Sequence, residues 1–148
     1  MYVYGIRRLF SFKEYVVEEV QFAEDLAEVG LRRDKRYNLT CPKCGAKMTK
    51  DRSIQQTARD IPICQAKGVV LVYEAIQGRC QKCNCYSTIH PEGIDPYAKA
   101  TWRMMVFTAH LCRFIPLKRV QEIIPVSAAT ANRWDKKVLE RELPESDL

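Results

Sequence analysis

The sequence has no uncharged apolar run that approaches the ~20 residues of a membrane-spanning helix. Residues 1–8 lack the apolar core and small-residue cleavage site of a secretory signal, so we expect no signal peptide. Internal repeats and low-complexity segments are also lacking. Seven cysteines, an odd number, argue against a fully paired disulfide framework, and a hydrophobic content of 47% argues against wholesale disorder. These absences favour a folded protein of the reducing cytoplasm.

Four of the cysteines form two Cys-x-x-Cys pairs. They are Cys41, Cys44, Cys80 and Cys83. Each pair places two thiolates on one tight turn, where both sulfurs can reach the same ion at about 2.3 Å. Gly45 and Asn84, which follow the pairs, readily adopt the left-handed conformation that such a turn needs. The sequence therefore predicts a closed tetrahedral site for one structural Zn²⁺.

The remaining cysteines leave an alternative for the fourth ligand. Cys85 competes with Cys83, because a Cys-x₄-Cys turn is also feasible. We favour Cys83, since Asn84 then has the same role as the glycine after the first pair. Cys64 and Cys112 lie among apolar neighbours and are predicted to be small buried residues.

The first part of the chain has the patterns of strands. In residues 12–22, apolar and polar side chains alternate imperfectly, as in a strand. Residues 23–25 suit a turn, and residues 26–31 suit a second strand that returns beside the first. A helix is the competing prediction for this segment. Residues 68–76 are rich in β-branched side chains and lead towards the second cysteine pair. We predict a small β-rich, zinc-ribbon-like module over residues 1–90.

Residues 91–96, which contain two prolines and a glycine, are predicted to break regular structure and to form a linker. Helical periodicity follows from Trp102 to Phe114, with a short helix from Pro116 to about Ile124. Ser127 suits the N-cap of a third helix that runs to about residue 141. The predicted fold class is α+β, with an all-α, three-helix helix-turn-helix domain over residues 97–148.

The charge and the last helices point to DNA. Residues 32–60 carry nine Lys and Arg against three Asp, and residues 103–137 carry seven against two acidic residues. In the short helix, Val120, Ile123 and Ile124 are expected to face inward. The residues expected to face the major groove are Ala128, Ala129, Thr130, Asn132 and Arg133. Those expected to contact phosphates are Lys118, Arg119, Lys136 and Lys137.

Two other interpretations stay open. The last helices also fit an ordinary helical hairpin whose polar side chains face water. The whole chain also fits a zinc-ribbon module that binds a protein or RNA and has no preference among duplex sequences. A homodimer is left open by the sequence.

In the order of its parts, the stretch from about residue 10 to residue 137 resembles the amino-terminal half of insertion-sequence transposases of the ISL-three group. Residues 41–45 (CPKCG), residues 59–62 (RDIP) and residues 126–130 (VSAAT) carry the resemblance. It implies double-stranded DNA as partner, with transposon terminal inverted repeats as target in a bacterial nucleoid. The family's catalytic, RNase H-like half has no counterpart in these residues, so the resemblance implies recognition of DNA ends without enzymatic activity.

Overall fold

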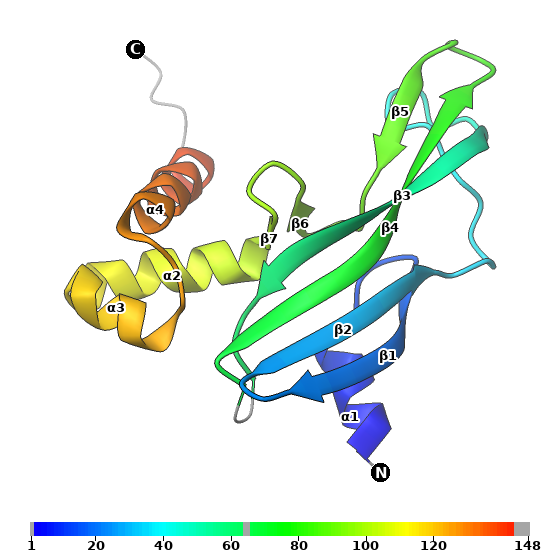
Figure 1. Ribbon diagram of the computed structural model, residues 1–148. Helices are drawn as coiled ribbons and strands as arrows, with labels where there is room; N and C mark the ends of the chain where they lie inside the picture. Colours follow the sequence, from blue (N-terminus) through cyan, green and yellow to red (C-terminus); the bar gives the residue numbers. More distant parts are fainter. Residues whose placement is uncertain (1, 64–65, 144–148) are drawn as a thin grey trace, which may run out of the picture.

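The computed structural model describes residues 2–63 and 66–143, which form an α+β fold with a mixed seven-stranded sheet and four helices (Figure 1). The elements in chain order are α1 (Tyr2–Leu9), β1 (Tyr15–Ala23), β2 (Leu26–Arg33), β3 (Met48–Asp60), β4 (Gly68–Cys80), β5 (Tyr86–Ile89), β6 (Ile94–Asp95), β7 (Ala100–Thr101), α2 (Trp102–Phe114), α3 (Leu117–Ile123) and α4 (Ala128–Glu142). The predicted α+β class is confirmed. The expectation of a small ribbon is wrong, since the sheet is larger than a ribbon.

The sheet has the strand order β1-β2-β4-β3-β7-β6, and β5 pairs with β4 beyond the end of β2. β1 and β2 form an antiparallel hairpin, as expected for residues 12–31, so the competing helix is wrong there. β2 pairs with β4 in parallel, which requires a long connection between them. That connection contains the first cysteine pair and all of β3.

β3 and β4 are the longest strands, and they run antiparallel from the cysteine turns to the helical end of the molecule (Figure 1). β4 was expected from its apolar run, and its residues are mostly buried. β3 was not expected. Among the described residues, its partner on the outer side is a single position of β7, and most of its side chains are exposed and polar. An edge strand of this kind lacks the apolar alternation that identifies a strand from sequence.

Two apolar clusters form most of the core. One lies against the sheet and contains Phe10, Val29, Leu71 and Tyr73, which are all almost fully buried. The other lies between the helices and contains Met105, among others. Each cluster contains residues that are far apart in the chain, so both clusters are formed by long-range contacts.

α2, α3 and α4 begin and end close to the expected residues, whereas α1 was not expected. The Ser127 hydroxyl accepts a hydrogen bond from the Thr130 amide at 3.1 Å, which is the expected N-cap of α4. In α3, Val120 is fully buried and so is Ile124 just beyond the helix, as expected. Ile123 is 49% exposed, and its expected inward position is wrong because it lies on the outer side of this short helix.

The prolines of residues 91–96 suggested that this segment has no regular structure. That prediction is wrong, because the segment contains β6, which pairs with β7. Next to it, the fully buried carboxylate of Asp60 at the end of β3 accepts hydrogen bonds from Thr101 Oγ1 at 2.7 Å and Arg103 Nε at 2.8 Å. Arg103 also donates to the Leu9 carbonyl at 2.6 Å. This network joins the start of α2 to the sheet and to the carboxy-terminal end of α1.

Candidate metal centre and helical surface

Two turns of the same construction hold the cysteine pairs. In the first turn, the Cys41 amide donates to the Ala46 carbonyl at 2.7 Å. In the second, the Cys80 amide donates to the Cys85 carbonyl at 2.9 Å, which is the same i to i+5 closure. Gly45 has φ +73° and Asn84 has φ +58°, so both adopt the expected left-handed conformation.

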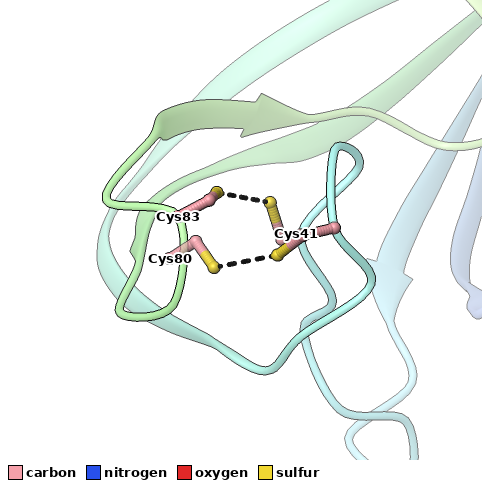
Figure 2. Close-up of side chains that lie close together, drawn as sticks. Cys41, Cys80 and Cys83 are labelled. Carbon is pink, nitrogen blue, oxygen red and sulfur yellow. Dashed lines mark hydrogen bonds between the residues drawn. The ribbon is translucent and has the colours of Figure 1, made fainter.

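The two turns face each other across the end of the β3–β4 pair. Figure 2 shows Cys41 opposite Cys80 and Cys83. The Sγ atoms of Cys41 and Cys83 lie 3.6 Å apart, and those of Cys44 and Cys80 lie 3.4 Å apart. All four sulfurs lie within 4.8 Å of one another, so the four expected residues are close enough to bind a metal ion.

The sulfur separations fit the proposed kind of ion. Four thiolates at about 2.3 Å from a tetrahedral metal are about 3.8 Å from one another. The observed separations of 3.4 and 3.6 Å are near this value. Cys41 and Cys80 are buried, and the four thiolates would fill all four positions of a tetrahedral ion. The donor set is therefore compatible with a structural zinc.

Backbone amides prepare the first thiol of each turn for ionisation. The Cys83 amide is the main cause that lowers the pKa of Cys80 to about 6, and the Cys44 amide is the main cause that lowers the pKa of Cys41. For Cys83, the Cys85 amide acts in the lowering direction. Burial and neighbouring thiols together outweigh it and raise the pKa to about 12. A metal that binds Cys83 would therefore displace the proton of its thiol.

The structure distinguishes Cys85 from Cys83. Cys85 is the counterpart of Ala46, because each closes its turn through a backbone carbonyl. Its sulfur lies outside the four-sulfur group and is 3.6 Å from the Cys83 carbonyl oxygen. Cys112 is only half-buried, so the prediction of a buried residue is not met there. Cys64 lies outside the described residues.

The helical surface is divided into two sides along α4. Ala131, Trp134 and Val138 are buried against the other helices. At 100° per residue, the expected DNA-facing side chains lie mostly in one arc on the opposite side. Those that are exposed in this arc are Ala128, Ala129, Asn132, Arg133 and Lys136. Thr130 lies at the margin, is half-buried and is part of the N-cap.

Several of the predicted phosphate contacts are occupied within the chain. Lys137 forms an ion pair with Asp95, whose carboxylate also accepts the amides of two residues in the β6–β7 loop. Arg119 pairs with Glu122 at 3.0 Å, and Lys136 lies 4.0 Å from Glu140. Lys118 is exposed. Position along the sequence could not reveal the Lys137 pairing, because Asp95 belongs to the linker and not to the helices.

Arg59 was not among the predicted site residues. Its guanidinium lies over the Trp134 ring, 5.5 Å from the ring centroid, and donates to the Pro125 carbonyl at 3.5 Å. The end of β3 therefore contacts the turn between α3 and α4 directly. The Arg–Asp pair at residues 59–60 is visible in the sequence, but its role at this junction depends on strand pairing.

Comparison with known proteins gives no match, whether with family models, curated proteins or solved structures. Among residues 2–63 and 66–143, no helix is long and apolar enough to cross a membrane.

Proposed function

We propose that this chain is a zinc-containing protein that binds double-stranded DNA by placing α4 in the major groove. The observation that carries the proposal is the two-sided character of α4. Its buried stripe packs against the other helices, and its exposed arc holds small, amide and cationic side chains near the capped N-terminus. This is the end that a recognition helix presents to base edges.

Each exposed side chain has a chemical role in this proposal. Asn132 suits a bidentate contact with adenine, and Arg133 suits one with guanine. The methyl groups of Ala128 and Ala129 suit the thymine methyl group. Lys136 and Lys118 suit phosphates, which fix the register of the helix on DNA. Lys137 was predicted from the sequence to contact a phosphate, but its ion pair with Asp95 is the better assignment.

Zinc has a structural role in the proposal. Cys41, Cys44, Cys80 and Cys83 would hold the ion, and its chemistry is to link two turns by four metal–thiolate bonds. Besides the ends of β3 and β4, the turns are joined by a small apolar cluster that includes Ala46 and Ile89, and by a contact between Lys43 Nζ and Cys85 Sγ at 3.7 Å. The ion would therefore stabilise the outer end of the sheet and leave the helical end to its own apolar core.

The resemblance to ISL-three transposases supports a transposon end, in the form of an inverted repeat, as the DNA target. We propose recognition of that target without strand transfer by these residues. The alternative is a zinc-ribbon module that binds a protein or RNA, and it requires that no duplex sequence be preferred.

Selection of bound fragments from a randomised duplex pool tests the proposal, with zinc present and near-physiological salt. One enriched motif is expected. Arg133→Ala and Asn132→Ala should each lower affinity for it by about 1–3 kcal/mol and relax the preference at one position. Arg32→Ala is the matched control, because Arg32 is an exposed arginine of β2, outside the helices. Failure to enrich any motif would refute the proposal and favour the interaction module.

A further inference from the structure

The cysteine end of the sheet carries a cluster of cations that the helical surface does not explain. We call it the metal-end surface. Its members are Lys43, Lys47, Lys50, Arg52, Arg79 and Lys82. They come from the first turn, from β3, from β4 and from the second turn, and all six are exposed. Only the pairing of β3 with β4 and the approach of the two turns bring them together.

None of these six cations takes part in an ion pair in the described part of the chain, whereas half of the other Lys and Arg residues there do. For example, Arg33, Arg36 and Arg103 each pair with a carboxylate. The side-chain hydrogen bonds that the metal-end cations donate within the described residues go to amide oxygens or to a thiol and not to carboxylates. Arg52 Nε, for example, donates to the Gln77 side-chain oxygen at 2.5 Å. Asp51, the carboxylate between Lys50 and Arg52 in the sequence, accepts a hydrogen bond from the Tyr86 hydroxyl at 2.9 Å.

A bound metal does not neutralise this surface. Zinc with four thiolates has two net negative charges. Together with the charge of Asp51, this leaves about three positive charges in surplus from the six cations. Exposed cations without carboxylate partners, gathered from several segments, are typical of a surface that binds phosphates.

The sheet sets the spacing between this surface and α4. Met48 pairs with Cys80 at the metal end, and Arg59 contacts the turn before α4 at the other end. The strand between these residues spans about 35 Å, at roughly 3.2 Å per residue. One turn of B-DNA is about 34–36 Å. Figure 1 shows β3 joining the β5 end of the sheet to the helices.

From this geometry we infer that the metal-end surface binds the backbone of the same DNA duplex, about one helical turn from the groove occupied by α4. The inference rests on the proposed function and adds a second contact to it. The metal-end contact carries no base preference, because its side chains are flexible cations that suit phosphates.

The test compares two triple variants in the full chain with zinc. Lys47→Gln, Lys50→Gln and Lys82→Gln together remove three charges from the metal-end surface. The control, Arg7→Gln, Arg8→Gln and Lys67→Gln, removes three exposed charges from α1 and from the residue before β4, at the end of that strand away from Cys80. Zinc content and circular dichroism show that each variant is folded. Affinity for the selected duplex is then measured against salt concentration, and hydroxyl-radical footprinting maps backbone protection.

The metal-end variant should keep the selected motif, and the slope of log affinity against log salt should become shallower by about 2.7, which is 0.9 per phosphate contact. Between 50 and 200 mM salt, the wild type should lose roughly 40-fold more affinity than this variant. Protection about 10 base pairs from the motif should disappear. The control should behave as the wild type.

An unchanged slope and footprint, with the motif still selected, would overturn the metal-end contact and leave the proposed function standing. If the wild type selects no motif but the metal-end variant still loses salt dependence, the phosphate contact holds and the role of α4 is refuted. If neither protein binds duplex DNA, both proposals fail.

Discussion

The assignment of Cys83 rather than Cys85 as the fourth metal ligand gives a sharp prediction. The two thiols are two residues apart in one turn, so Cys83→Ser and Cys85→Ser are matched variants. Cys83 Sγ is 3.6 Å from Cys41 Sγ within the four-sulfur group, whereas Cys85 serves the turn through its carbonyl. Only the first substitution should therefore remove a ligand.

The expected size follows from the energy of a structural zinc. Zinc binding in small structural sites contributes about 10–16 kcal/mol, so one of four ligands accounts for about 3 kcal/mol, or roughly a 100-fold loss of affinity. Cys83→Ser should show this loss in competition with a chelator of known affinity. With Co²⁺ as probe, its thiolate charge-transfer absorbance should fall by about one quarter, since about three of four thiolates remain.

Cys85→Ser should bind the metal as tightly as the wild type, with unchanged Co²⁺ absorbance. The reverse result, with metal affinity lost in Cys85→Ser and retained in Cys83→Ser, would refute the assignment. Equal losses in both variants would also refute it, because the structure gives the two sulfurs different positions.

Three further predictions concern the rest of the fold. Asp60→Ala should lower the free energy of unfolding by about 3 kcal/mol in urea titration, since it removes the buried acceptor of hydrogen bonds from three residues and leaves the buried Thr101 hydroxyl without its partner. Asp51→Ala, at an exposed position, should change this free energy by less than about 0.5 kcal/mol. Ser127→Ala should cost about 1 kcal/mol through loss of the α4 cap, and an unchanged melting temperature would contradict that role. Burial raises the pKa of Tyr73 from 10.0 to about 12, so this phenol stabilises the fold below pH 10, and that contribution is lost as the pH rises towards 12. Unfolding free energies measured across this window should fall less steeply in Tyr73→Phe than in the wild type.

Removal of the metal should act on one end of the molecule first. Chelation is expected to increase amide exchange in the two cysteine turns and in β5 before it does so in α2 and α4, since the helices have their own apolar cluster. Equal and simultaneous loss of protection throughout the described residues would show that the metal centre and the helices unfold as one unit.

Local features of this protein were predictable because short-range chemistry sets them. The Cys-x-x-Cys spacing together with Gly45 and Asn84 specified two tight turns. The 3.6-residue period specified α2, the Ser127 cap specified the start of α4, and the β-branched run specified β4. In each case, the signal lies within a few residues of the element that it forms, so one sequence is sufficient.

Tertiary structure decided what long-range pairing controls. It made the polar segment of β3 a strand against β4, joined β2 to β4 in parallel, and paired Lys137 with Asp95 of the predicted linker. It also separated Cys83 from Cys85, which the sequence left as alternatives. The sequence by itself determined the chemistry of the turns and of the capped helix. Their separation and relative placement came from the sheet, because strand partners distant in the chain leave no local periodic signal.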